Sequence, residues 1–294
     1  TRGEGDSECI VCLYVDDMLT GSREKDIIAS VKAGIAEKFR IKDLGRARFI
    51  LGIEIDYDME RKALAICQRA YTESLIKTFG QENAKPALTP LDPSVHLTKN
   101  DEPQADEDKV KMKSKRYRSL VGRPDTSKIQ RHWDAGIKVV RYLLKTKDVA
   151  ITYDGRMGTE LTAYSDADWA GNSDDRRSVT GVMLMMCVIA SRKLYGCDVY
   201  SRTLEDIGAE QHGPTVIYED SQGAMALAKN VGYQARTDIR YHFIREKIAS
   251  GEVELTYEES KNQLADFLNK DLSTETLRYL LKQSNVGPKL EISN

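Results

Sequence analysis

The chain has 294 residues, of which 40% are hydrophobic and 31% charged, and its formal net charge is −2. This composition is typical of a globular protein with a buried core, and it excludes a disordered or low-complexity chain. No apolar run reaches the roughly 20 residues of a membrane span, so we expect no membrane partner. The five cysteines are irregularly spaced. Their spacing favours a reducing compartment, cytoplasmic or nuclear, over a secreted disulfide framework.

The N-terminal part predicts a strand, a tight turn and a strand over residues 9–20. Its stretch "LYVDDML" carries two adjacent carboxylates, Asp16 and Asp17, between apolar residues. Burying two like charges is unfavourable unless a cation neutralises them. Ser22 is expected to N-cap a helix that continues to about Phe39. A hairpin over 47–68 and a short helix over 70–79 are then expected. The chain opens with Thr1 and not with Met, which predicts a fragment or one piece of a larger polyprotein.

Residues 81–115 hold four of the seven prolines and predict a connecting segment. An acidic stretch over 101–108 is followed there by a basic block over 109–118. A basic block can bind a nucleic-acid backbone, although a solvated linker explains it equally well. The candidate nucleic-acid-binding residues are Lys109, Lys111, Lys113, Lys115, Arg116 and Arg118.

Strand-like runs dominate after a further helix expected over 132–147. Antiparallel strands followed by a β-α-β-α pattern predict a mixed sheet covered by helices. We therefore predict an α/β (α+β) chain with three parts, at residues 1–80, 81–147 and 148–294.

Three acids of the last part share an apolar setting. Asp166 falls within a strand, Asp220 at a strand-to-helix junction and Asp266 on an apolar helix. Acids that converge in this way hold Mg²⁺ in enzymes that cleave phosphodiesters with two metal ions. Two of them also have an ordinary explanation, because Asp220 could cap a helix starting at Ser221 and Asp266 could face solvent.

Several longer motifs resemble one family. "LYVDDML" resembles the YxDD turn of reverse transcriptases, and "FRIKDLGRARFILGIEI" is similar to the segment that follows it in copia-type (Ty1/copia) retrotransposons. Four further motifs resemble the RNase H domain of that family: "YSDADWAGNSDDRRSVTG", "IYEDSQGAMALAKN", "DIRYHFIREKI" and "NQLADFL". The resemblance implies the C-terminal part of a Pol polyprotein: a reverse-transcriptase palm remnant (1–80), a connecting region (81–147) and an RNase H-like domain (148–294).

The resemblance also implies roles for the matching acids. Asp16 and Asp17 would be catalytic metal ligands of the polymerase turn, with Asp16 the direct ligand. Asp166, Asp220 and Asp266 would be catalytic metal ligands of the RNase H site. The implied cofactor is Mg²⁺ or Mn²⁺ in a two-metal arrangement. The implied partners are an RNA–DNA hybrid or other nucleic acid and further segments of the parent polyprotein.

Two departures from the family pattern predict reduced activity. The polymerase site needs another upstream Asp, whereas only Glu4, Asp6 and Glu8 precede the turn here. The family's fourth RNase H carboxylate is a Glu on a long helix, but about 12 residues, 202–213, connect the flanking strands. They span at most ~18 Å as a helix, so one helix is expected to be missing. Glu205 and Glu210 are the nearest glutamates.

We therefore expect an inactive polymerase and an impaired nuclease, and whether the chain is an enzyme stays open. One alternative is a non-catalytic nucleic-acid-binding module that retains the sheet and the basic block. The other is a decayed pseudogene product without a molecular function.

Overall fold

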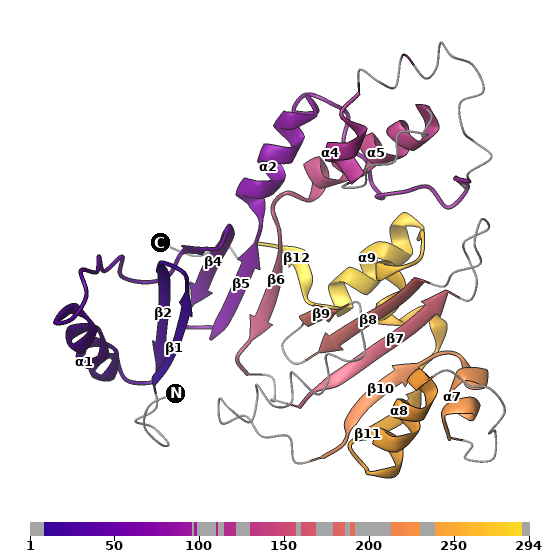
Figure 1. Cartoon of the computed structure of the whole chain (residues 1–294). Helices are drawn as coiled ribbons and strands as arrows, with labels where there is room; N and C mark the ends of the chain where they lie inside the picture. Colours follow the sequence, from indigo (N-terminus) through magenta and orange to yellow (C-terminus); the bar gives the residue numbers. More distant parts are fainter. Residues whose placement is uncertain are drawn as a thin grey trace.

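The computed structural model describes residues 9–95, 97–98, 110, 115–121, 130–156, 160–168, 179–185, 189–191, 213–229 and 239–289. Within these ranges the chain forms a two-stranded hairpin and two five-stranded sheets, with helices between and around them (Figure 1). The mixed α/β class predicted from the sequence is confirmed. No helix in these ranges is both long and apolar enough to cross a membrane.

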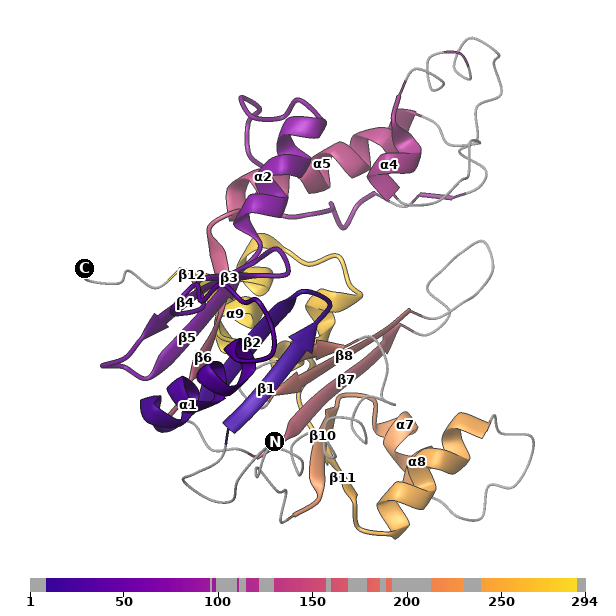
Figure 2. The same ribbon diagram turned by 60° about the vertical axis from the view of Figure 1, so that its left-hand side comes forward.

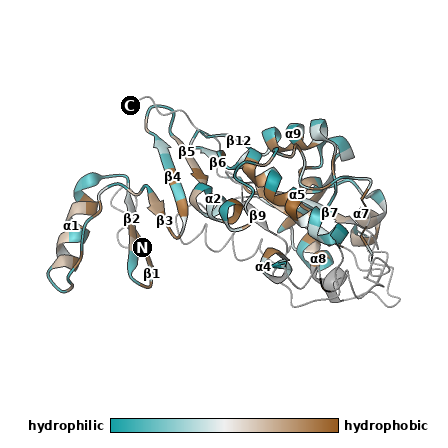
Figure 3. Ribbon diagram, turned by 90° about the horizontal axis from the view of Figure 1, so that it is seen from above, coloured by the Kyte–Doolittle hydropathy of each residue, from teal (hydrophilic) through white to brown (hydrophobic). Residues whose placement is uncertain are grey.

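The N-terminal hairpin pairs β1 (Cys9–Tyr14) with β2 (Asp17–Ser22), as expected from the sequence. The helix α1 (Lys25–Ala36) follows, and the three elements lie together at one end of the molecule (Figures 1 and 3). Ser22 is not the N-cap of α1, because pairing with Cys9 keeps it in the β-ladder. Glu24 holds the N-cap position without a side-chain cap bond.

The first five-stranded sheet joins distant parts of the sequence in the order β12-β6-β5-β4-β3. Its members are β3 (Phe49–Ile50), β4 (Ile53–Asp58), β5 (Ala63–Cys67), β6 (Val149–Asp154) and β12 (Val286–Pro288), all antiparallel. A small core of Ala65, Cys67 and Ala150 lies between β5 and β6. The strands β6 and β12 thus share a sheet with β3–β5, and the division of the chain at residues 147 and 148 stays a prediction.

Two helices expected from the sequence connect this sheet to the rest of the chain. The helices α2 (Arg69–Thr78) and α5 (Gln130–Thr146) begin and end within two residues of the expected ranges, and they pack against each other. The rings of Phe79 and Trp133 meet edge to face, with their centroids 6.2 Å apart. The short helix α4 (Tyr117–Val121) packs on α5.

The second five-stranded sheet has the order β11-β10-β7-β8-β9. Its members are β7 (Thr162–Asp168), β8 (Val179–Met185), β9 (Ile189–Ser191), β10 (Thr215–Glu219) and β11 (Val253–Tyr257). The pairs β7–β8 and β8–β9 are antiparallel, whereas β10 runs parallel to both β7 and β11. The predicted mixed sheet is therefore confirmed.

Helices pack on both faces of this sheet (Figures 1 and 2). On one face Ala163, Leu184 and Ile217 pack with Ile248 of α8 (Ile239–Ala249), and α7 (Gln222–Lys229) contacts α8. Neighbouring strand residues point to the opposite face, where Met183 packs on Leu264 and Leu280. These two leucines belong to the 3₁₀-helix η4 (Leu264–Leu268) and to α9 (Thr274–Gln283). A shorter 3₁₀-helix, η3 (Ser260–Asn262), precedes η4.

Candidate metal centre

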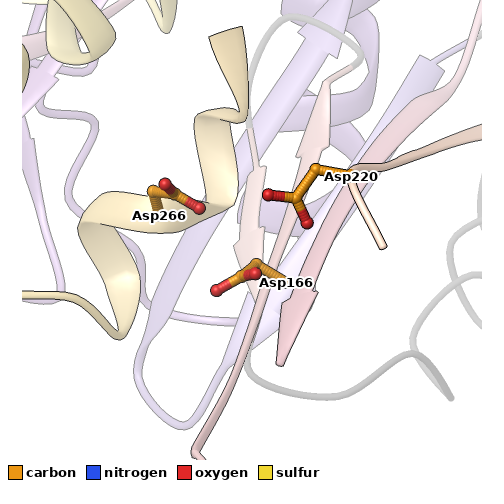
Figure 4. A group of neighbouring side chains, drawn as sticks. All are labelled: Asp166, Asp220 and Asp266. Carbon is orange, nitrogen blue, oxygen red and sulfur yellow. The ribbon is translucent and has the colours of Figure 1, made fainter. Parts of the chain in front are cut away.

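Three carboxylates converge on the η4 side of the second sheet (Figure 4). One oxygen of Asp166, one of Asp220 and one of Asp266 lie within 4.8 Å of one another. Asp166 and Asp266 are only 4% and 7% exposed, and Asp220 is half-buried. The structure therefore brings together the three acids singled out in the C-terminal part of the sequence.

The parallel pairing of β7 and β10 places two of these acids. Ser165 lies opposite Glu219 in the ladder. The next residues, Asp166 within β7 and Asp220 directly after β10, therefore lie side by side on the same face. Asp220 does not cap α7, because Ser221 Oγ accepts the N–H of Ala224, 3.2 Å away. Asp220 instead accepts a hydrogen bond of 2.7 Å from Ser260 Oγ at its Oδ2.

The third acid lies on a helix, as expected from the sequence, and this helix is η4, a short 3₁₀-helix. Asp266 is buried and does not face solvent. The buried side chain of Gln263 anchors this segment: its Nε2 donates to the carbonyl oxygens of Ser165 (3.0 Å) and Tyr218 (3.3 Å). Its Oε1 accepts the N–H of Ala265 at 3.2 Å. One amide thus connects β7 and β10 to the turn that carries Asp266.

Gly181 of β8 allows this turn to approach the sheet. It lies opposite Asp166 in the antiparallel ladder. A Cβ atom at this position would lie 2.7 Å from the carbonyl oxygen of Ala265 and 3.1 Å from Leu268 Cβ. Real Cβ atoms essentially never approach backbone so closely, so only glycine fits without moving η4.

Lys270 lies between two of the acids. Its Nζ is 3.1 Å from Asp166 Oδ1 and 2.8 Å from Asp266 Oδ1. The neighbouring Asn269 donates from Nδ2 to Asp166 Oδ2 at 2.7 Å. Both oxygens of Asp166 are therefore held by consecutive side chains of one segment.

Burial shapes the acidity of this cluster. It raises the pKa of Asp266, an effect that the hydrogen bond from Lys270 opposes and that the charges of Asp166 and Asp220 reinforce. Burial by itself lowers the pKa of Lys270, but hydrogen bonds to Asp266 and Asp166 outweigh it and leave that pKa above its usual value. Lys270 is accordingly an ammonium ion at neutral pH.

A fourth carboxylate, Glu219, lies next to Asp220 in the sequence but points to the opposite face of β10. Its Oε2 accepts from Ser165 Oγ at 2.6 Å, and its Oε1 accepts the N–H of Ser221 at 3.2 Å. Burial raises the pKa of Glu219, and the charges of Asp220 and Asp166 raise it further. Glu219 supports the turn that carries Asp220. The two glutamates considered from the sequence, Glu205 and Glu210, lie outside the described residues.

The donor set suits a hard divalent cation. Mg²⁺ and Mn²⁺ prefer carboxylate oxygens, and here three come from separate segments of the chain. Three clustered acids also carry more negative charge than the single ammonium of Lys270 offsets, which favours a cation of higher charge. The residues present therefore fit a divalent metal ion.

The other predicted metal ligands, Asp16 and Asp17, lie at the tip of the N-terminal hairpin. Their apolar neighbours do not bury them, because Leu13 and Val15 are 73% and 80% exposed. The two carboxylates are therefore exposed to solvent and are not buried among apolar side chains. Val15 has a φ of 52°, an unusual value for a β-branched residue. Among the described residues, the acids grouped as potential metal ligands do not include this pair, and its role stays a prediction.

Most of the predicted basic segment lies outside the described residues, namely Lys109, Lys111, Lys113 and the side chain of Arg118. Lys115 hydrogen-bonds to Gln130, and its Nζ lies 5.3 Å from the centroid of the Trp133 ring. Arg116 is exposed. Nucleic-acid binding by this segment stays a prediction.

Sequence reasoning missed the residues that organise the metal centre, which are Gly181, Glu219, Gln263, Asn269 and Lys270. A partial signal existed for Lys270, because it follows Asp266 by four residues, a spacing that favours ion pairs in helical segments. The contacts of Gln263 with β7 span 98 residues, and no local pattern predicts them.

Comparison with known proteins first defines the class. A model of the family described as "Reverse transcriptase (RNA-dependent DNA polymerase)" matches residues 1–93. The N-terminal part of the chain is therefore of the reverse-transcriptase class.

Curated relatives extend the comparison to most of the chain. The retrovirus-related Pol polyprotein from transposon TNT 1-94 of Nicotiana tabacum is 32% identical over 308 residues, covering 89% of this chain and 23% of that protein. The corresponding Pol polyproteins from transposons RE2 and RE1 of Arabidopsis thaliana are each 29% identical, covering 92% of this chain and 21% of each relative. The chain therefore belongs to the family of copia-type retrotransposon Pol polyproteins, as its motifs predicted.

The chain spans about a fifth of the length of these relatives. The aligned stretch of 308 positions in the tobacco relative exceeds the 294 residues of the chain. The relative therefore has residues at some aligned positions where this chain has none.

Proposed function

We propose that residues 148–294 act as an RNase H-like nuclease domain of a copia-type Pol polyprotein. The substrate class is the RNA strand of an RNA–DNA hybrid, and the cofactor is Mg²⁺ or Mn²⁺. The observation that carries this proposal is the convergence of Asp166, Asp220 and Asp266 from two parallel strands and a 3₁₀-helix.

The surrounding residues hold the acids in place. Ser260 orients Asp220, Asn269 orients Asp166, and Gln263 fixes the segment that carries Asp266. Burial of Asp166 and Asp266 excludes bulk water from the oxygens that would bind the metal. A divalent cation bound there would lower the pKa of a water molecule and stabilise the leaving oxygen of the phosphodiester.

The proposed nuclease is impaired, because the family's two-metal arrangement uses a fourth carboxylate on a long helix. The 12 residues 202–213 are too few for that helix and its two connections. Glu219 is held on the other face of the sheet by Ser165 and the Ser221 N–H, so it does not replace the missing carboxylate.

A cleavage assay tests the proposal. The full chain is incubated with labelled RNA–DNA hybrid and either Mg²⁺ or Mn²⁺, beside the variants Asp166→Asn and Asp266→Asn. We expect slow, metal-dependent cleavage that both variants abolish. Asp26→Asn on the exposed surface of α1 is the matched control and retains the wild-type rate.

Cleavage that survives in Asp166→Asn would contradict the proposal, because the activity would then come from another site or a contaminant. Binding of the hybrid that weakens with salt, without any cleavage, would favour the non-catalytic nucleic-acid-binding module instead.

For the N-terminal hairpin we propose a role that depends on other segments of the polyprotein. Asp16 and Asp17 contribute to a polymerase metal site only together with carboxylates from other segments of the polyprotein, since two acids on one exposed turn cannot enclose two ions. Residues 1–294 alone are expected to show no primer extension on an RNA template. Extension that is lost in Asp16→Asn would contradict this.

A further inference from the structure

The ammonium group of Lys270 lies where a divalent cation would have to bind. It is 3.1 Å from Asp166 Oδ1 and 2.8 Å from Asp266 Oδ1, within the range of an ion pair with each. Both acids belong to the group whose oxygens lie within 4.8 Å of one another. A metal ion bound by this group and the Lys270 ammonium would therefore compete for the same two carboxylates.

The two acids and the lysine differ in their freedom to move. The side chains of Asp166 and Asp266 are only 5% and 10% exposed, whereas that of Lys270 is 35% exposed. Asp166 is further held by Asn269, and the turn of Asp266 is anchored by Gln263. Lys270 has a long, flexible side chain with a path to solvent, so it can leave the cluster while the acids stay.

We propose that Lys270 is a tethered counterion that occupies the carboxylate cluster without metal and is displaced into solvent when a divalent cation binds. The exchange breaks two ion pairs of Lys270 and replaces them with metal–oxygen bonds. Each metal-binding event therefore includes the free-energy cost of releasing the ammonium, and Lys270 lowers the metal affinity of the site. The inference deepens the proposed function, since it concerns the same three acids.

Direct metal binding tests this in the full chain, without nucleic acid. Mn²⁺ binding is measured by the electron paramagnetic resonance signal of the free ion for wild type, Lys270→Met and Lys270→Arg. Methionine keeps the apolar stem and removes the charge, whereas arginine keeps the charge. We expect the Kd for Mn²⁺ to fall about tenfold in Lys270→Met, a change of about 1.4 kcal/mol, and to stay near the wild-type value in Lys270→Arg.

Two controls assign the effect to this site. Lys282→Met removes the same charge from the exposed surface of α9 and should leave the Kd unchanged. Adding Asp166→Asn to Lys270→Met should cancel the gain in affinity. Binding of Mn²⁺ by Lys270→Met that equals or is weaker than that of the wild type would overturn the proposal.

A second measurement needs no variant, and so remains decisive if Lys270→Met does not fold. The wild-type chain is acetylated for a short time with and without Mn²⁺, and the modification of each lysine is measured by mass spectrometry. Release of the ammonium should raise the modification rate of Lys270 severalfold when Mn²⁺ is present, with that of Lys282 unchanged. An unchanged or lower rate at Lys270 would overturn the proposal.

The outcomes separate this inference from the proposed function. Exchange of Lys270 for Mn²⁺ without any cleavage of the hybrid would support the inference and contradict the nuclease. Cleavage that is lost in Asp166→Asn, with a modification rate of Lys270 that Mn²⁺ does not change, would support the nuclease and contradict the inference.

Discussion

Burial at single residues gives the second sheet a measurable dependence on pH. Glu219 hydrogen-bonds to Ser165 Oγ and to the N–H of Ser221, yet burial still raises its pKa. A group whose pKa is raised on folding stabilises the protein at low pH, and this contribution is lost as pH rises through the folded-state pKa. The ionised form of Glu219 thus destabilises the fold near neutral pH.

We therefore expect Glu219→Gln to be more stable than the wild type at pH 7–8. The difference in Tm should shrink as pH falls through about 4.3, the usual pKa of glutamate, because well below this pH Glu219 is neutral in both the folded and the unfolded chain. Thermal unfolding of both proteins between about pH 4 and pH 8 measures this difference in Tm. Glu254→Gln, at an exposed position on β11, is the control and should give a difference that does not change with pH. A constant difference for Glu219→Gln would refute the expectation.

Gln263 gives a second prediction for a single residue. Gln263→Ala removes the donor to the carbonyls of Ser165 and Tyr218 and the acceptor for the N–H of Ala265. Leaving buried polar groups without partners costs about 1–3 kcal/mol, so the free energy of unfolding in urea should fall by about that amount. Mn²⁺ affinity should fall as well, since the Asp266 turn loses its anchor.

Gln283→Ala, at the exposed end of α9, is the matched control and should change neither quantity appreciably. If Gln263→Ala lost stability but retained its Mn²⁺ affinity, the amide would stabilise the sheet without positioning the metal centre.

Among the elements, the close packing of η4 on β8 determines where Asp266 lies. Gly181→Ala would place a Cβ atom 2.7 Å from the carbonyl oxygen of Ala265, and η4 would have to move away from the sheet. Overpacking of this kind costs about 1–3 kcal/mol. We expect a lower Tm and weaker Mn²⁺ binding. Gly213→Ala, where nothing lies within 4 Å of the added Cβ, should retain both values.

The elements also show what the sequence could predict. The helices α2 and α5 have strong local patterns, and the β4–β5 hairpin has alternating apolar residues around a polar turn, so all three were predicted closely. The apolar residues around Asp266 predict a helix, but spacing alone does not distinguish an α-helix from a 3₁₀-helix over five residues. Ser22 was misplaced because extension of the β2 ladder overrode its capping preference.

In the metal centre too, features with a local sequence signal could be predicted, and features that depend on distant contacts could not. The three acids lie in motifs that resemble a family, and their convergence follows once β7 and β10 pair in parallel. The requirement for Gly181 and the role of Gln263 arise from contacts between segments far apart in the sequence. Such contacts depend on the packed structure and leave no periodic signal in the local sequence.

At the scale of the whole molecule, the C-terminal segment completes a sheet whose other strands come mostly from the N-terminal part (Figure 1). The strand β12 pairs with β6, and Lys289 directly after it lies 3.0 Å from Glu54 Oε2 and 2.7 Å from Asp56 Oδ2. Lys289 and Glu54 are 235 positions apart in the sequence, so this contact ties the C-terminal segment to the N-terminal part of the sheet. Lys289 neutralises two partly buried acids on one strand, so its removal leaves like charges facing each other.

Lys289→Met should therefore loosen the first sheet and leave the metal centre intact. We expect a lower Tm and faster amide hydrogen exchange in β4 and β6, because β4 carries the unpaired acids and β6 pairs with the weakened β12. Exchange in β7 and β10 and the affinity for Mn²⁺ should match the wild type. Lys145→Met, at an exposed position on α5, is the control for the loss of one positive charge. Equal acceleration in β7 and β10 would instead show that the two sheets open as one cooperative unit.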